Sequence, residues 1–459
     1  MPAAPLRLDS IRACLEGAVP GVMATCALDG TPNVTIISQV EYVDADHVAL
    51  SFQFFSKTRH NVLANPMAEL LVVHPQHGAM YRLRTRYLRT ESEGALFERM
   101  KAKLAGIASH EGMAGVFRLR GADVYAVDRV EQVVAPRNEP AIGGANRLSA
   151  LRRAAQAVAA AGDLEGLIEA LLDALVREFG AEHALLMLLD AGAQRLYTVA
   201  SRGYERSGAG AEVALGDGVI GTAARAATSI RINHATLEYR YARTMREGVA
   251  ADLIGREIPL PGLVDPGSQL AVPLACGGRV LGVLYAESAL EFRFDWDDED
   301  ALTALATQAA AQLNALAGVA AQPIDEPADP AAMADASAAE TCAVCAEPAA
   351  AEPLRVRHFA ADDSVFVDDD YLIKGVAGAV LWKLLRDHAE SGRTEFSNRE
   401  LRLSPEIRLP EVGDNLEARL VLLTRRLVDR DAPLRLQKTG RGRFRLCVAR
   451  PLALSHVPR

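Results

Sequence analysis

The segment from Ala317 to Pro353 sets the strongest limit on how this chain can fold. It consists almost entirely of Ala, Pro, Asp and Glu, and such a composition cannot bury enough apolar surface to form a core. A shorter stretch that mixes Pro and Gly lies at 134–146. We therefore expect a multidomain α+β protein of 459 residues. The expected domains are 8–134, 147–316 and 357–450, with 317–353 as a disordered linker.

Composition restricts where such a protein works. Half of the residues are hydrophobic and 24% are charged, which allows sizeable cores. The sequence contains no apolar run of 18 residues, and no basic segment followed by an apolar one at its start. Six scattered cysteines in a chain of this length do not make a disulfide framework. These features predict a cytoplasmic protein with no membrane partner.

Two of the cysteines form a Cys342-x-x-Cys345 pair inside the linker. A structural zinc ion needs four ligands, and His358 is the nearest further candidate. We therefore predict no metal site within one chain. A zinc ion shared by two chains, a redox switch and a pair of unpaired surface cysteines all stay open.

The first domain is predicted to be a small antiparallel barrel. After an opening helix at 8–19, alternating and β-branched runs are separated by turns at 29–30 and 44–46. Further strands are expected at 68–74, 80–91 and 123–133, and a helix at 94–106. Several short antiparallel strands with one or two helices are typical of a closed sheet.

The segment 51–73 places a serine and a lysine after a strand, then a helix that ends in Asn65-Pro66, then another strand. This order resembles the flavin-binding split barrel of the pyridoxamine-phosphate oxidase type, over most of residues 10–133. The resemblance implies an FMN site whose strand residues lie along the flavin and whose helix start clamps the phosphate. The residues implied are Thr35, Ile37, Phe52, Gln53, Ser56, Lys57, Thr58 and Arg59.

Two departures from that pattern keep the cofactor open. Thr58 stands where a second basic residue is usual, and Asn33 stands where the strand often carries Arg. A barrel without flavin is one alternative. Related barrels hold haem or a deazaflavin, and the candidate haem ligands are His60, His74, His77 and His110. No catalytic residue is assigned.

The middle domain is predicted to be a helix–sheet–helix sandwich. Two helices, broken at Gly162-Asp163, precede antiparallel strands, and an amphipathic helix at 297–317 follows them. The order resembles the GAF sensory domain, with Gly216-x-Gly218-x-Ile220-Gly221 and the hairpin turn at 277–278 as its most specific pieces. We interpret these glycines as turn and close-packing residues, not as a phosphate cradle.

The GAF resemblance implies either of two roles for this domain. The long segment 233–267 is the expected lid of a small-ligand pocket, whose ligand is unknown. The pattern of cyclic-nucleotide binders is absent, since Asn233 is followed by His234. The alternative is pure dimerisation through the helices at 148–180 and 297–317, and we expect a homodimer.

The last domain is basic in an acidic protein. Residues 393–450 carry fourteen Lys and Arg against eight Asp and Glu, whereas the whole chain has a net charge of −9. Within this range, 414–431 has leucines at helical spacing with arginines on the other faces, and 434–448 alternates like a hairpin broken at two glycines. A cationic helix followed by a cationic hairpin can contact a DNA groove and phosphates.

The segment from about 357 to 448 resembles the winged-helix effector domain of response regulators, with Ser397 and Glu400 as a capping box. That resemblance implies double-stranded DNA as the partner. Acidic residues on the same helix favour the alternative of a protein-docking surface. The residues implied for DNA contact are Asn415, Arg419, Arg425, Arg426, Lys438, Arg441 and Arg443.

Together these features predict a signal-responsive regulator that senses a redox state or small ligand and regulates transcription through DNA. The alternatives are an FMN-dependent oxidoreductase regulated by its other domains, and a protein-docking scaffold.

Overall fold

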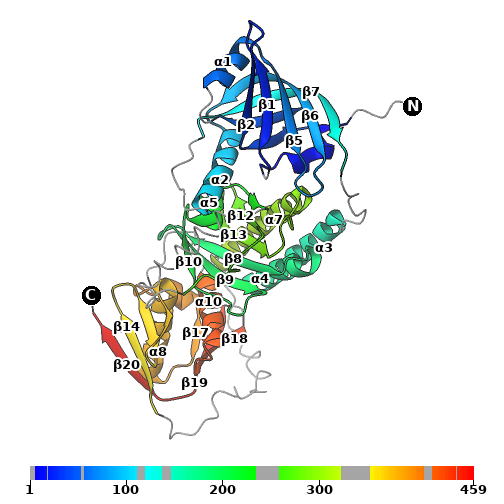
Figure 1. Ribbon diagram of the computed structural model, residues 1–459. Helices are drawn as coiled ribbons and strands as arrows, with labels where there is room; N and C mark the ends of the chain where they lie inside the picture. The colour runs from blue at the N-terminus through cyan, green and yellow to red at the C-terminus, as the bar shows by residue number, and fades with distance from the viewer. Residues whose placement is uncertain are drawn as a thin grey trace.

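The computed structural model describes residues 6–17, 19–52, 56–110, 119–136, 146–233, 258–321, 352–407, 416–440 and 442–458. Figure 1 shows three units that follow one another along the molecule, with the N-terminal barrel at one end and the C-terminal unit at the other. Among the described residues, no helix has the length and apolar character needed to cross a bilayer.

The N-terminal unit is built on a seven-stranded antiparallel sheet of order β2-β1-β5-β6-β7-β4-β3. Alternation of buried and exposed side chains along β1 explains why this strand forms: Met23 and Thr25 face the core while Val22 and Ala24 face outward. The elements are η1 (Leu8–Cys14), β1 (Gly21–Cys26), β2 (Pro32–Ile37), β3 (Val40–Asp44), β4 (His47–Phe52), α1 (Ser56–Ala64), β5 (Met67–Val73), β6 (Met80–Glu91), α2 (Ala95–His110) and β7 (Gly121–Val134).

The opening helix is shorter than the predicted span of 8–19. It is a 3-10 helix that ends at Cys14, with a non-helical backbone at Ile11. Gly17 then takes a positive φ of 75°, which turns the chain into β1. The apolar residues of this segment therefore pack against the barrel through a short, tight helix, and Leu8, Ile11 and Leu15 are buried there.

The middle unit is a six-stranded antiparallel sheet of order β10-β9-β8-β13-β12-β11. Side chains alternate between its two faces. Leu186 and Leu188 of β8 pack on the face that α3, α4 and α7 cover, and Leu185 and Met187 pack with α5 on the opposite face. The elements are α3 (Arg147–Ala160), α4 (Leu164–Asp173), η2 (Ala174–Glu178), β8 (His183–Asp190), β9 (Arg195–Arg202), β10 (Glu212–Ala214), α5 (Gly218–Ala226), β11 (Ile230–Ile232), β12 (Ser268–Cys276), β13 (Arg279–Ser288) and α7 (Trp296–Ala321).

The helices of this unit begin and break where their capping residues predict. The side chains of Asn146 and Asp163 accept hydrogen bonds from the amides of Ser149 and Gly166, and so cap α3 and α4. The final helix extends to Ala321, so it includes the first five residues of the predicted linker. Alanine is the strongest helix former, which accounts for this continuation.

The apolar stripes of α3 and α7 face one another within the same chain. Ala150, Ala154 and Val158 of α3 are buried in the core that also holds Leu305 and Ala309 of α7. In addition, the Gln308 amide nitrogen of α7 donates to the Ala155 carbonyl of α3 at 2.9 Å. These contacts account for the apolar residues that suggested pairing between protomers, and the dimer stays a prediction.

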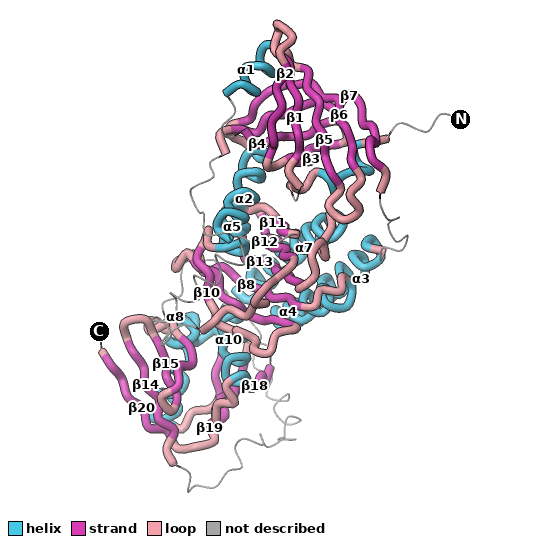
Figure 2. Tube along the Cα trace, viewed as in Figure 1, coloured by secondary structure: helices cyan, strands magenta, loops and turns pink. Residues whose placement is uncertain are grey.

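The described part of the C-terminal unit contains two small sheets, and helices pack beside them (Figure 2). One sheet has the order β16-β15-β14-β20 and the other β17-β19-β18. Ser397 caps α9 by accepting from the Glu400 amide, as predicted. The elements are β14 (Leu354–Phe359), β15 (Ser364–Val367), β16 (Asp370–Ile373), α8 (Gly375–Ser391), β17 (Glu395–Ser397), α9 (Asn398–Leu403), α10 (Leu416–Asp429), β18 (Leu434–Gly440), β19 (Arg443–Val448) and β20 (Leu452–Val457).

Strand β20 lies beyond the predicted domain end at residue 450. It pairs in parallel with β14, from Leu354 opposite Leu452 to Phe359 opposite Val457. The partner strands are separated by almost a hundred residues, and no local pattern of the sequence connects them.

A buried ionic cluster joins the barrel to the middle unit. The Arg231 guanidinium of β11 contacts the carboxylate of Glu16 at 2.7 Å and that of Glu299 at 2.9 Å. Trp296 lies at the same junction, where its indole nitrogen donates to the Arg12 carbonyl at 2.9 Å. The side chains of all three charged residues are less than one tenth exposed.

Candidate functional site

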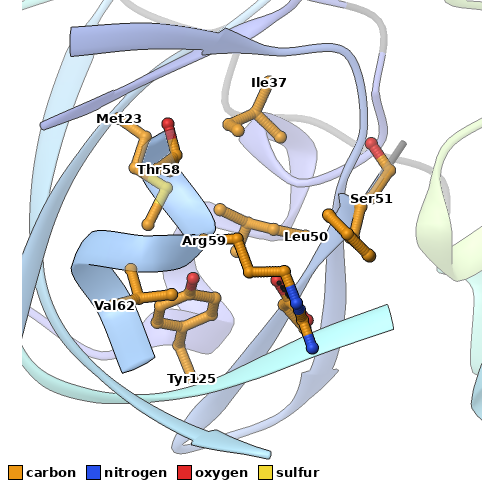
Figure 3. A pocket seen from close by; sticks show the side chains of 10 residues that line it. Met23, Ile37, Leu50, Ser51, Thr58, Arg59, Val62 and Tyr125 are labelled. Carbon is orange, nitrogen blue, oxygen red and sulfur yellow. Dashed lines mark hydrogen bonds and ion pairs between the residues drawn. The ribbon is translucent and has the colours of Figure 1, made fainter. Parts of the chain in front are cut away.

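The predicted flavin residues lie around the start of α1, but they do not form one open pocket. Phe52, Thr58 and Arg59 line a cavity with Ile37 and Tyr125 (Figure 3). Its volume is about 10 Å³, which is about the room that a single water molecule needs. The isoalloxazine ring of a flavin therefore has no enclosed site in this cavity.

Arg59 is held by groups of the barrel itself. Its guanidinium contacts the Asp123 carboxylate at 3.0 Å, donates to the Thr90 hydroxyl at 3.1 Å and stacks over the Phe52 ring at 4.3 Å. Thr90 also donates to Asp123 at 2.5 Å. These groups neutralise and orient the cation within the barrel, and a role of Arg59 in binding a phosphate stays a prediction.

The remaining members of the predicted set divide into three groups. Thr58 is buried and accepts a hydrogen bond from Asn33 at 2.9 Å. Thr35 is half-buried on β2, and Lys57 is exposed and makes no hydrogen bond or ion pair to the described residues. Gln53 and the side chain of Ser56 lie outside the described part. The phosphate end of a flavin therefore has one fitting cation, Lys57, at the start of a helix.

The histidines considered for haem do not converge. His74 and His77 stack with ring centroids 3.5 Å apart, and each accepts a hydrogen bond from a nearby backbone amide. Burial, with a contribution from His77, lowers the pKa of His74 to about 4, so its ring is neutral at pH 7. His60 is exposed on α1, and the His110 side chain lies outside the described residues. No group of three metal-ligating side chains occurs in the described ranges.

A buried polar cluster lies on the α5 face of the middle sheet and was missed by sequence reasoning. Tyr204 and Tyr285 donate to the two carboxylate oxygens of Glu287, each at 3.0 Å. Gln269 donates to the Tyr285 hydroxyl at 2.6 Å, while its own carbonyl oxygen is buried and accepts no hydrogen bond. The signal available in the sequence was a glutamate at an inward position of a hydrophobic strand. Of the predicted lid at 233–267, residues 234–257 lie outside the described part of the chain.

The residues predicted to contact DNA lie in three different environments. Arg419 and Arg425 of α10 form ion pairs with Asp190 and Glu169 of the middle unit, each at 2.6 Å. Arg426 is buried in its own unit, where its Nε donates to the Leu372 carbonyl at 2.8 Å. Arg419 and Arg426 are therefore both buried in this arrangement, and their contact with DNA stays a prediction.

The hairpin that follows α10 is more open. Lys438 and Arg443 are exposed, and Lys438 contacts Asp163 of α4 at 2.6 Å. Asn415 and Arg441 lie outside the described residues. A groove of about 350 Å³ separates α10 from this hairpin, with Leu420, Val421 and Phe444 among its lining residues.

Comparison with known proteins covers the first two units. Residues 8–128 match the pyridoxamine 5′-phosphate oxidase family model, and residues 161–314 match the GAF domain model. No curated protein matches the chain.

Three solved structures are similar to parts of this chain. An FMN-binding protein from Syntrophomonas wolfei is 18% identical, and the match covers 28% of this chain and 88% of that one, with a TM-score of 0.25. The GAF domain of an Acinetobacter phosphoenolpyruvate-protein phosphotransferase is 21% identical over 40% and 100% of the two chains, with a TM-score of 0.31. Free methionine-R-sulfoxide reductase from Neisseria meningitidis is 21% identical over 38% and 91%, with a TM-score of 0.30.

The strand order of the barrel, the helix-covered central sheet and the two family matches agree with one another. This chain therefore carries a domain of the pyridoxamine 5′-phosphate oxidase type at residues 8–128 and a GAF domain at residues 161–314.

Proposed function

We propose that the protein is a cytoplasmic, signal-responsive regulator whose N-terminal barrel and GAF domain sense a ligand and whose C-terminal unit binds double-stranded DNA. The observation that carries the proposal is the sequence of elements after residue 354. A small sheet, α8, the capped helix α9, helix α10 and the hairpin β18–β19 follow one another in the order expected of a winged helix. The third strand of the hairpin's sheet, β17, also fits that arrangement.

The charge of the hairpin supports DNA as the partner. Arg443 is exposed near its tip, whereas Lys438 and Arg445 are exposed along its two strands and pair with Asp163 and Glu395. Exposed cations on a projecting hairpin can contact phosphates without reading bases. The GAF domain supports the sensing part, since its buried Gln269 oxygen has no hydrogen-bond donor among the described residues and could accept from a ligand.

Salt dependence of duplex binding tests the DNA proposal. Replacing Arg441 and Arg443 by Ala should reduce the slope of log affinity against log salt by about two, because each lost phosphate contact removes about one released counterion. The matched control replaces the exposed Arg129 and Arg279, which lie in the other two units, and should keep the full slope. An equal slope for the parent and the hairpin variant would favour a protein-docking role for the C-terminal unit.

A flavin-dependent oxidoreductase is the second candidate, and Lys57 is the observation that favours it. An exposed cation beside the first turn of α1 fits a phosphate, and bound FMN would supply redox chemistry. Because a charged hydrogen bond contributes about 1.5–3 kcal/mol, Lys57→Ala should weaken FMN binding by that amount in a fluorescence titration. Lys101→Ala removes an exposed lysine of α2 and should have no effect. Equal affinities of the parent and Lys57→Ala would show that the family fold does not bring the cofactor with it.

We also propose a homodimer. The outward face of β1 and β2 exposes Val22, Val34 and Ile36, which are 38%, 66% and 65% exposed. Adjacent apolar side chains on one sheet face favour contact with another copy. Light scattering at micromolar concentration should give twice the chain mass of 49.1 kDa, and the mass of one chain would contradict the dimer.

A further inference from the structure

We propose that the GAF domain holds the C-terminal unit in a closed state by binding the cationic side of α10, and that DNA binding requires release of this contact. The closed contact consists of Arg419, Arg425 and Lys438 with three GAF carboxylates. The closed contact is inferred from ion-pair distances and burial alone. Its consequence for DNA binding rests on the function proposed above.

Arg419 is the centre of the closed contact. Its guanidinium lies 2.6 Å from the Asp190 carboxylate at the end of β8, and its side chain is only 7% exposed. The same guanidinium stacks over the Tyr197 ring of β9 at 4.0 Å. A planar cation held by a carboxylate and an aromatic face is bound as a ligand would be. While Arg419 lies there, it cannot contact a nucleic acid.

Two further ion pairs extend the contact along α10 and into the hairpin. Arg425 contacts Glu169 of α4 at 2.6 Å, and Lys438 contacts Asp163, the capping residue of α4, at 2.6 Å. Asp429 accepts a hydrogen bond from the Ser207 hydroxyl of the GAF domain. Each cation in this set was predicted from the sequence to contact DNA. The GAF carboxylates therefore occupy the groups that phosphates would use.

The signs of the charges make the closed state and the DNA-bound state mutually exclusive. The cations come from the C-terminal unit and the carboxylates from the GAF domain, so the closed contact satisfies the cations in the absence of DNA. A duplex that approaches the same side of α10 would bring phosphates against Asp190 and Glu169, and like charges repel. A signal that moves α4 or the β8–β9 edge would shift this balance.

Arg426 provides an internal reference for an experiment. As whole residues, Arg426 and Arg419 are each 6% exposed, but the partner of Arg426 is the Leu372 carbonyl within the C-terminal unit. Opening of the closed contact should expose Arg419 and leave Arg426 buried. Unfolding of the C-terminal unit would expose both.

The test measures how fast phenylglyoxal modifies each arginine in the full chain, by peptide mass spectrometry. The opening variant is Glu169→Gln with Asp190→Asn. The control variant is Glu131→Gln with Glu178→Gln, which removes the same charge from carboxylates that pair with Arg82 and Arg153. Side-chain exposures are 43% and 17% in the opening pair and 43% and 24% in the control pair.

Modification of Arg419 should be slow in the parent and the control, and about 5- to 150-fold faster in the opening variant, the range of ordinary coupling between sites. The rate for Arg426 should not change. Equal rates for Arg419 in all three proteins would overturn the closed contact.

Duplex binding by the same three proteins separates the two claims. The opening variant should bind a random-sequence duplex about 5- to 150-fold more tightly than the control. Faster modification of Arg419 with no duplex binding by any of the proteins would contradict the proposed DNA function and leave the closed contact standing. Duplex binding that is equally tight in the opening and control variants, with Arg419 released, would contradict the inference that the contact restrains DNA binding.

Discussion

Arg231→Met should lower the free energy of unfolding at the barrel–GAF junction by about 3–5 kcal/mol, the usual cost of removing one partner of a buried ion pair. The Arg231 side chain is 3% exposed between Glu16 and Glu299, which are 8% and 9% exposed. Burial already raises the pKa of Glu16 against the attraction of Arg231. Methionine keeps most of the volume but removes the cation that contacts both carboxylates, and leaves Glu299 with the longer-range attraction of Lys103 and Arg99.

Trp296 reports on this junction, because its ring lies 4.8 Å from the Arg231 guanidinium. Denaturant unfolding followed by its fluorescence, in a Trp382→Phe background, measures the effect. Arg279→Met removes an exposed cation at a hairpin turn. Its free energy of unfolding should stay within about 0.5 kcal/mol of the parent's. A loss below about 1 kcal/mol for Arg231→Met would contradict a junction held by this buried cluster.

Gly221→Ala should destabilise the GAF domain by about 1–3 kcal/mol, the usual cost of overpacking. A Cβ at this position would lie 2.1 Å from the Ala214 carbonyl oxygen and 3.0 Å from the Gly216 nitrogen. Both neighbours are backbone atoms, so the start of α5 would have to move away from β10. Thermal unfolding measured by calorimetry would show the loss.

Gly162→Ala is the matched control for this substitution. No heavy atom lies within 4 Å of a Cβ placed there, and the residue has no positive φ. The melting temperature of Gly162→Ala should equal that of the parent or exceed it slightly. Equal melting temperatures for the two variants would show that the glycines near α5 have no packing role.

The glycine motif shows what a sequence predicts well. Gly216 and Gly218 take positive φ values of 90° and 56°, and Gly221 lies in close backbone contact. These are local requirements of a tight turn into a helix, so residue type and spacing were enough to interpret them. The capping of α9 by Ser397 was predictable for the same reason, since its partner is three residues away.

The candidate sites depended on contacts that no local pattern contains. Arg419 and Arg425 have the spacing of solvent-facing residues on a leucine-striped helix, yet their partners lie more than two hundred residues earlier. Arg59 likewise pairs with Asp123 on a distant strand, a contact that the spacing around the predicted phosphate clamp does not reveal. Periodicity reports which side of a helix is apolar, and it cannot report that a neighbouring domain covers the charged side.

The same limit applies to the flavin site predicted for the barrel. The order of strands and the Ser56-Lys57 pair predict the fold, which the family match confirms. Whether a ring fits depends on the space left by Met23, Val62 and Tyr125, and their packing leaves a cavity of about 10 Å³. Volume is a property of the assembled core, and a motif specifies only part of its lining.

Selection of duplex fragments from a genomic library by the full-length protein is the measurement that tests the central claim most directly. Recovered fragments should share a common sequence, and the Glu169→Gln, Asp190→Asn variant should enrich the same sequence more strongly than the parent. Recovery of no common sequence by either protein, at a salt concentration where both are folded, would contradict the account of a DNA-binding regulator.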